Sequence, residues 1–263
     1  MSDLSNNERK YLQKLRQKKY RQQHRQILIE GIRLCEEALT SDWRLKQLYI
    51  TEDFPAHSDA DRLLGLAGEK HLIPTEIEES EMQQITDTKR SQGIALLADL
   101  PEERAFEPDP EWHPHVLLLD GISDPGNLGT LLRSADWFGV RDCLLGPGSV
   151  EWSNPKVVRS TMGAVFRMHL TSLDSWPPVL STLREARYTL IAADVDGKRI
   201  SGVHQENHPV TWALILGNEA HGISGQLADE VDLKVSIPGE GPGDSLNVAM
   251  AGTIFLYELT PFR

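Results

Sequence analysis

Cysteine is scarce in this sequence of 263 residues: only Cys35 and Cys143 occur, far apart and in no pair motif. They indicate no disulfide framework, and we expect both as small core residues of a protein in a reduced, cytoplasmic setting. No cluster of Cys and His residues has metal-ligand spacing, so no metal is predicted. His113 and His115 flank a proline-rich segment, and a metal role for them is the less favoured interpretation.

Long apolar runs are also absent. No run approaches the ~18 residues of a membrane span. The first residues, MSDLSNNERKYLQK, lack the apolar core and the cleavage site of a secretory signal. With 40 % hydrophobic and 25 % charged residues, the composition is that of a soluble globular protein, and no membrane partner is expected.

Motifs that cradle phosphate groups are missing as well. Neither GxxxxGK[ST] nor GxGxxG opens a helix in this sequence. The segment LDGISDPGNLG, which begins at Leu119, lacks the Lys-Ser/Thr pair, and its Asp residues would repel phosphate. A polyphosphate ligand is therefore disfavoured, whereas a ligand held by backbone hydrogen bonds, such as an adenine with a ribose, remains compatible.

Basic residues are outnumbered, and the net charge of −12 argues at first sight against a nucleic-acid partner. Residues 1–25 depart from this balance, because eight Lys or Arg and two acids give them +6 and leave −18 for the rest. A basic arm on an acidic body is typical of a local phosphate-binding device. A solvated helix with a chance excess of charge is an equally good interpretation. The arm suits a helix with only a weak apolar stripe, which is compatible with mobility.

Strand and helix patterns alternate through residues 26–100, which predicts a small α/β domain. Residues 101–114 hold four prolines and five acids and are interpreted as a linker. From residue 115 to 263, near-continuous apolar strands alternate with helices, which predicts a mostly parallel sheet covered on both faces. The last helix, NVAMAGTIFLYEL, is apolar almost all round, so we expect it to be buried.

Two apolar strands near the end of the chain each run into a Gly-rich loop. The first loop is Gly217–Gly222, and the second spans residues 238–244 and opens a helix at Ser245-Leu246-Asn247. Glycines let a ligand approach the backbone closely, and adjacent strand ends of this kind form pockets. Either loop alone is more simply a tight turn. Together, with Asn-Glu and Ser-Leu-Asn at their tips, they indicate a binding site.

A helix predicted from Asn127 to Phe138 contributes the third element. Asn127 is its expected cap, and Leu128, Leu131, Leu132 and Ala135 form its buried stripe together with Phe138. Arg133 points off that stripe and could reach the strand ends; a merely solvated surface Arg is the alternative. His221, at a loop tip, is interpreted as exposed rather than catalytic.

The segments VLLLDGISDPGNLGTLLRSADWFGV, LILGNEAHGIS and IPGEGPGDSLNVAMAGTIFLYE occur in this order. They resemble the three motifs of the SpoU/TrmH family of RNA 2′-O-ribose methyltransferases. Residues 26–100 resemble, less specifically, an RNA substrate-binding domain akin to a ribosomal-protein RNA-binding fold. The chain departs from the family pattern at Gly239, where members often have Met, and a slightly changed loop is expected there.

The resemblance implies an α/β fold whose C-terminal domain is a trefoil-knotted, mostly parallel sheet, with an S-adenosyl-L-methionine site at the knot. Cofactor contacts carry over to Gly217, Asn218, Ile237 and Leu246. Arg133 is the residue that the family implicates in activating the ribose hydroxyl, which we interpret as electrostatic stabilisation of the alkoxide. Four residues would orient the reacting groups: Asn127, Glu219, Ser245 and Asn247.

The resemblance further implies a homodimer that methylates structured RNA without a metal, with ribosomal RNA as the first expectation and transfer RNA as the second. Two alternatives remain. One is a non-catalytic RNA-binding protein that keeps the fold, against which the retained polar residues argue. The other is a small-molecule enzyme with a different cofactor, against which the basic arm and the RNA-binding-like domain argue.

Overall fold

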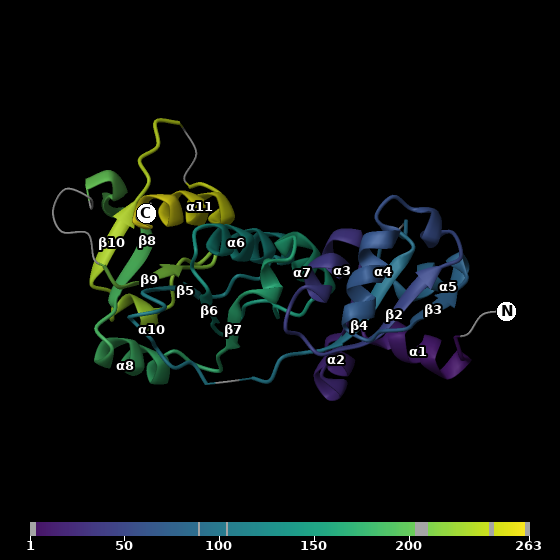
Figure 1. Cartoon of the computed structure of the whole chain (residues 1–263). Coiled ribbons are helices and arrows are strands. Elements are labelled where there is room, and N and C mark those ends of the chain that lie inside the picture. Colours follow the sequence, from purple (N-terminus) through teal and green to yellow (C-terminus); the bar gives the residue numbers. More distant parts are fainter. Residues whose placement is uncertain (1–3, 89, 104, 203–209, 242–244, 261–263) are drawn as a thin grey trace. The chain divides into compact units, whose positions relative to one another are not determined.

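The computed structural model describes residues 4–88, 90–103, 105–202, 210–241 and 245–260. They form two compact units (Figure 1). Unit 1 comprises the chain up to Glu102 together with Ser153–Phe166, and unit 2 comprises Glu103–Trp152 and the chain from Arg167 onward. Among the described residues, every helix is too short or too polar to span a lipid bilayer.

Unit 1 is built on a four-stranded mixed sheet in the order β1-β4-β2-β3. β4 pairs antiparallel with β1 and β2, and β3 pairs parallel with β2. The strands are β1 (Gln26–Glu30), β2 (Leu45–Thr51), β3 (Pro74–Ile77) and β4 (Ile94–Asp99). The helices between them are α3 (Ile32–Leu39), α4 (Ala60–Glu69) and α5 (Glu79–Ile85), with a 3-10 turn at Phe54–Ala56. The strands and helices predicted for this region are confirmed.

The basic arm is folded onto unit 1 rather than mobile. It forms α1 (Asn6–Lys14) and α2 (Lys18–His24), and the Leu12 and Leu15 side chains are buried in the same core as Ile77 and Met82 of the sheet region. Arg21 is buried too: its guanidinium donates hydrogen bonds to the carbonyl oxygens of Leu15 (2.8 Å) and Arg16 (2.6 Å). Burial lowers the pKa of Arg21 to about 10. The weak apolar stripe of the arm therefore suffices to pack it against the sheet of unit 1. Arg21, one of the arm's cations, stabilises the fold.

A piece of the chain that follows β6 belongs to unit 1. It holds α7 (Pro155–Thr161) and a 3-10 turn at Ala164–Phe166. The Arg159 guanidinium pairs with the carboxylates of Glu30 and, at 2.7 Å, Asp87. α7 ends at Thr161, because the next residue, Met162, adopts a left-handed conformation (φ +51°). The chain thus leaves the parallel sheet after β6 and returns at β7.

Unit 2 contains a six-stranded sheet in the order β10-β8-β9-β5-β6-β7, and every neighbouring pair is parallel. The strands formed by residues 212–216 and 142–145 are buried along their whole length, as the apolar runs predict. The strands are β5 (His115–Leu119), β6 (Asp142–Leu145), β7 (His169–Ser172), β8 (Thr189–Arg199), β9 (Trp212–Leu216) and β10 (Leu233–Ser236). The predicted parallel sheet is confirmed; the trefoil knot stays a prediction.

Helices cover both faces of this sheet. α6 (Pro125–Trp137) and α11 (Val248–Leu259) lie side by side on one face, and α8 (Pro177–Glu185) and α10 (Gly225–Ala228) lie on the other (Figure 1). A 3-10 turn at Ile200–Gly202 follows β8. Cys143 is buried in β6 and Cys35 in α3, and burial raises the pKa of both thiols. Their predicted role as core residues is confirmed.

The expectation of a fully buried last helix is wrong. The inner face of α11 packs so closely that a Cβ on Gly252 would lie 2.4 Å from the Leu131 side chain. The opposite face carries Met250, Ile254 and Tyr257, which are 62 %, 37 % and 52 % exposed. These residues recur at helical spacing and form one stripe. An apolar helix is thus covered on one side only, since a single sheet face offers only one contact surface.

Candidate active site at the carboxyl ends of the parallel sheet

The carboxyl end of β5 is tied to its neighbours by Asp120, a residue that the sequence interpretation did not single out. Its backbone N–H donates to the carbonyl oxygen of Leu216 (2.9 Å) at the end of β9. Its buried carboxylate accepts hydrogen bonds from the indole N–H of Trp176 (2.9 Å) and the backbone N–H of Ser224 (2.7 Å). Asp120 therefore fixes the loop after β9 against the strand. An acidic residue directly after an apolar strand was the available signal.

The loop Gly217–Gly222 is held by its own backbone and by Asn218. The backbone N–H and C=O of Asn218 both bond to Gly222, at 2.9 and 2.8 Å. The Asn218 side chain accepts from the N–H groups of Ala220 (2.9 Å) and His221 (3.2 Å) and donates to Gly121 O (2.7 Å). Asn218 thus shapes the loop, and a direct contact with a cofactor stays a prediction.

Gly217 has no room for a side chain. A Cβ at this position would lie 2.4 Å from the carbonyl carbon of Gly222 and 2.6 Å from the nitrogen of Ile223. Glycine is therefore required by the loop's own closure, whether or not a ligand approaches it. A bulky residue at Gly217 would distort the loop itself, so such a variant could not test whether a ligand approaches this position.

α6 begins at Pro125, two residues earlier than predicted, and its cap is Asp124 rather than Asn127. The Asp124 carboxylate accepts from the Asn127 backbone N–H at 2.9 Å, and Pro125 occupies the first turn, where a missing N–H costs nothing. The prediction that Asn127 caps this helix is therefore wrong. The Asn127 side chain is consequently available for other contacts.

Three of the predicted residues meet at the starts of α6 and α11. The Asn127 side-chain amide donates to Glu219 Oε1 at 2.6 Å. The Asn247 amide donates to the same oxygen at 3.0 Å and to Asn127 Oδ1 at 3.1 Å. Asn247 also caps α11, since its Oδ1 accepts from the N–H groups of Ala249 and Met250. Each residue comes from a different Gly-containing motif, so folding joins all three motifs in one cluster, Asn127–Glu219–Asn247.

The cluster places a carboxylate at two helix N-termini. Helix N-termini carry partial positive charge and favour an anionic group, and two amides orient one oxygen of Glu219. Glu219 remains exposed to solvent, so its carboxylate is accessible to a ligand. A fixed acceptor of this kind can orient a hydroxyl or a cationic group.

Arg133 lies apart from this cluster within one chain. It is exposed on α6, as the stripe predicts, and no hydrogen bond or ion pair engages it among the described residues. Six residues separate Arg133 from Asn127, and at about 100° per residue they fall about 120° short of two full turns. The two side chains therefore leave the helix roughly a third of a turn apart. The fold therefore presents Arg133 on another side of α6.

The second Gly-rich loop is only partly described. Ile237 is half-buried, while Ser245 and Leu246 are exposed immediately before the Asn247 cap. Gly239 has open space where a Cβ would be. The predicted loop positions Pro242, Gly243 and Asp244 lie outside the described residues. His221 is exposed at its loop tip, as expected.

These residues fit one class of ligand better than others. The loops and helix starts offer amides, one carboxylate, glycine backbone and the apolar side chains of Ile237 and Leu246. Such a set suits a ligand with an aromatic base and a positive centre, and it lacks the Lys or Arg that a polyphosphate would require. The fit with S-adenosylmethionine is therefore good.

The sequence was compared with known families and proteins. The SpoU rRNA Methylase family matches residues 114–257, and the MRM3-like substrate binding domain matches residues 6–96. The second match includes the helices of the basic arm. The 23S rRNA (guanosine(2553)-2′-O)-methyltransferase RlmP of Bacillus subtilis is 31 % identical over 94 % of this chain and 93 % of its own length.

Two further proteins are similar along most of the chain. The mitochondrial rRNA methyltransferase 3 of Xenopus laevis is 30 % identical, covering 92 % of this chain and 70 % of that protein. The crystal structure of an AdoMet-bound rRNA methyltransferase from Sinorhizobium meliloti superposes with a TM-score of 0.85 at 26 % identity, covering 98 % of this chain and 96 % of that one. With the matched motifs meeting at the carboxyl ends of the sheet, the chain belongs to the SpoU rRNA methylase family.

Proposed function

We propose that this protein transfers a methyl group from S-adenosylmethionine to a ribose 2′-hydroxyl of structured RNA, with ribosomal RNA as the substrate and transfer RNA as the second candidate. The observation that carries the proposal is the Asn127–Glu219–Asn247 cluster, in which the three motifs meet at two helix N-termini. Family membership and the printed activity of the Bacillus subtilis relative support it.

The cofactor would lie between the two Gly-rich loops. Gly217 and Asn218 would contact it from the first loop, and Ile237 and Leu246 from the second. The cofactor supplies a methyl group on a sulfonium that is already a good leaving group, so positioning by the protein should account for most of the acceleration. The AdoMet-bound structural neighbour supports this assignment.

The chain's own contribution to the chemistry is to hold and polarise the ribose hydroxyl. A hydroxyl is a poor nucleophile until its proton is shared or lost. A guanidinium group offers N–H donors and positive charge but no acceptor, so the role of Arg133 is to stabilise the developing alkoxide by charge. Glu219, oriented by Asn127 and Asn247, would accept a hydrogen bond from the bound reactants, and Ser245 would complete the set.

A homodimer explains the separate positions of Arg133 and the cluster. The exposed stripe of α11 (Met250, Ile254, Tyr257) and the neighbouring Trp137 of α6, which is 84 % exposed, form an apolar surface of the kind that marks protein contacts. A second copy seated on this surface would complete the RNA site, as the family resemblance implies.

Unit 1 would supply the RNA affinity. The substrate-binding match supports this role, and Lys10, Lys14, Lys18 and Lys19 of the arm are exposed. Such lysines attract phosphates without sequence preference. Base recognition would then come from the remainder of unit 1 and from the catalytic face. The proposal places the protein in the cytoplasm, where ribosomal RNA is found.

Methyl transfer with purified protein tests the proposal. Labelled S-adenosylmethionine should methylate ribosomal RNA fragments more than transfer RNA, and ribose-methylation maps from cells with and without the gene should differ at a single 2′-oxygen. Calorimetry should detect micromolar cofactor binding without added metal. A folded protein that binds neither the cofactor nor its demethylated product would refute it. No observation on the described residues favours a non-catalytic RNA-binding role.

A further inference from the structure

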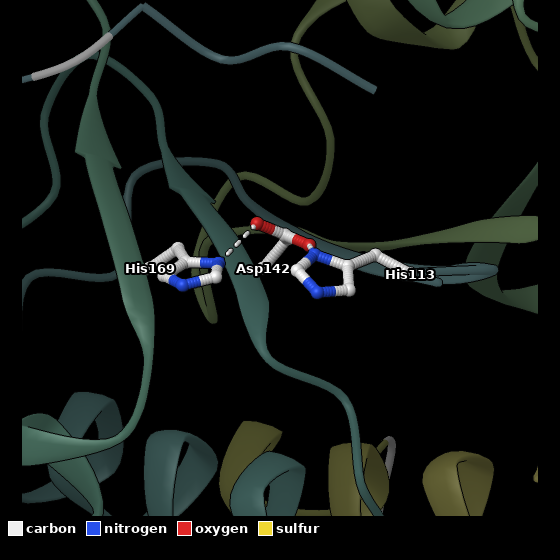
Figure 2. Close-up of side chains that lie close together, drawn as sticks. All are labelled: His113, Asp142 and His169. Atoms are coloured by element: carbon white, nitrogen blue, oxygen red, sulfur yellow. Dashed lines mark hydrogen bonds and ion pairs between the residues drawn. The ribbon is translucent and has the colours of Figure 1, made fainter. Parts of the chain in front are cut away.

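The amino ends of the parallel strands carry a second convergence of chemically active side chains. Asp142 begins β6, His169 begins β7, and His113 lies just before β5. Figure 2 shows the Asp142 carboxylate between the two imidazole rings. Nδ1 of His113 lies 2.5 Å from one carboxylate oxygen, and Nδ1 of His169 lies 3.2 Å from the other. Within the described part of the chain, no other group of three His, Cys, Asp or Glu residues converges in this way.

We propose that His113, Asp142 and His169 bind a divalent transition-metal ion, with Zn²⁺ as the best-fitting one. Two imidazoles and one carboxylate, with a fourth position left to water, are a ligand set that zinc accepts. The three ligand atoms all lie within 4.8 Å of one another. Small side-chain rotations would bring them to the spacing of about 3.4 Å that a tetrahedral zinc ion imposes.

The positions of the rings agree with this assignment. Their centroids are 5.1 Å apart and their planes differ by 29°. Two imidazoles that bind one tetrahedral zinc through a nitrogen at about 2.0–2.1 Å have centroids about 5 Å apart.

The backbone around the cluster is held in place. His169 is the register partner of Asp142 in the β6–β7 ladder, so both side chains leave the same face of the sheet. The His113 N–H donates to Asp109 O, and its C=O accepts from the Tyr188 hydroxyl, both at 2.6 Å. Ligands on such a frame lose little conformational entropy when a metal binds.

Burial and charge favour a cation at this position. The Asp142 side chain is 10 % exposed and that of His113 is 31 % exposed, whereas that of His169 is 62 % exposed and leaves an entry path. A partly buried carboxylate beside two imidazoles is an arrangement that a bound divalent ion would stabilise.

The metal would be structural. β5 runs from His115 to Leu119, and a strand of this length separates the cluster from the methyl-transfer site by about 13 Å. The ion would clamp the linker that precedes β5 to β6 and β7. His115 takes no part, since its ring stacks on Trp212 at 4.4 Å.

Titration of the tag-free, chelator-treated full chain with Zn²⁺ tests the proposal, with Co²⁺ as a spectroscopic probe. We expect one Zn²⁺ per chain at micromolar or tighter affinity, a Co²⁺ absorption spectrum typical of tetrahedral coordination, and a higher Tm with zinc. His169→Ala, at an exposed position that should fold normally, should weaken binding at least about tenfold. Asp142→Asn should do the same.

His57→Ala is the matched control, because His57 also faces a carboxylate, Asp59, at 3.4 Å on unit 1. This variant should bind zinc as the unaltered chain does. Absence of binding by the folded chain at submillimolar Zn²⁺ would overturn the proposal, as would binding that His169→Ala leaves unchanged. In either case the three side chains form only an ion-pair cluster.

Discussion

The two sheets of this protein end their strands in different ways. In unit 1 the strands are mixed, with β4 antiparallel to both neighbours, so each edge of the sheet collects both strand starts and strand ends. In unit 2 all strands are parallel, so the ends of β5 and β9 lie together and so do the starts of β5, β6 and β7. In a parallel sheet, the loops that follow strands therefore lie at one end of the sheet, and the loops that precede strands lie at the other.

Because of this arrangement, two groups of polar side chains lie at opposite ends of the strands in unit 2. The carboxyl edge of unit 2 gathers the Gly-rich loops and the Asn127–Glu219–Asn247 cluster, and the amino edge gathers His113, Asp142 and His169. In unit 1 the well-placed polar groups, such as Arg21 and the pair of Glu30 with Arg159, stabilise the fold itself. The comparison predicts that substitutions in unit 2 affect chemistry, whereas those in unit 1 affect RNA affinity.

The largest expected effect is that of Arg133→Ala. Removing a preorganised charge from a developing alkoxide should lower kcat by about 10²–10³-fold. Cofactor affinity by calorimetry should stay unchanged, because Arg133 lies on another side of α6 from the cluster. Arg44→Ala, at a side chain 79 % exposed on unit 1, is the control. Near-normal turnover by Arg133→Ala would remove it from the chemical step.

Glu219→Ala should have the next largest effect. It removes the acceptor shared by Asn127 and Asn247, and charge-assisted hydrogen bonds contribute about 1.5–3 kcal/mol. We expect kcat/KM to fall roughly 10–150-fold while the Tm stays within a few degrees, since the cluster is exposed. Glu185→Ala, also exposed in unit 2, should be silent. Equal loss in both variants would show that the cluster has no special role.

Asp120→Ala tests whether the hydrogen bonds of Asp120 hold the loop after β9 in place. The substitution leaves the Trp176 indole N–H and the Ser224 backbone N–H without their acceptor, and an unsatisfied buried donor costs about 1–3 kcal/mol. Urea unfolding should show a stability loss of that order together with weaker cofactor binding. Unchanged cofactor affinity would mean that the loop after β9 keeps its shape without Asp120.

The smallest effect is expected from the arm. Deleting residues 1–25 would expose the core around Leu12 and Leu15, so charge removal is the better experiment. Changing Lys10, Lys14, Lys18 and Lys19 to Gln should flatten the salt dependence of RNA binding by about 0.7–0.9 per lost phosphate contact. Turnover at saturating RNA should not change. Lys46→Gln with Lys70→Gln controls for general charge loss, and an unaltered slope in the arm variant would assign RNA affinity elsewhere.

Periodicity and strand composition predicted much of the fold. The apolar runs of β5 and β9 predicted buried parallel strands, and the Gly-rich ends predicted where the motifs meet. These are local signals that each segment carries by itself. The meeting of Asn127 with Glu219 and Asn247 followed only from the resemblance, because 92 and 28 residues separate the hydrogen-bonded pairs that involve Glu219.

The failures share a physical cause. Asp124 displaced Asn127 as the cap because Pro125 fits the first helical turn better than a later position. Arg21 is one of the eight cations counted in the arm, but two backbone carbonyls inside the arm accept its hydrogen bonds. The convergence of His113 with Asp142 and His169 gave no signal in the sequence, because strand register rather than sequence distance aligns Asp142 with His169. Each of these features depends on tertiary contacts, which cannot be read from a short stretch of sequence.

The return of Ser153–Phe166 to unit 1 has a consequence for synthesis on the ribosome. Glu30 is buried and pairs with Arg159, so its partner emerges long after the rest of unit 1. At about 5–20 residues per second, residues 103–166 take on the order of 3–13 s to be made. During that interval the carboxylate of Glu30 in the nascent N-terminal unit lacks its partner Arg159. Completion of that unit must wait until β6 of the second unit has been translated, so the two units mature in an interleaved order rather than one after the other.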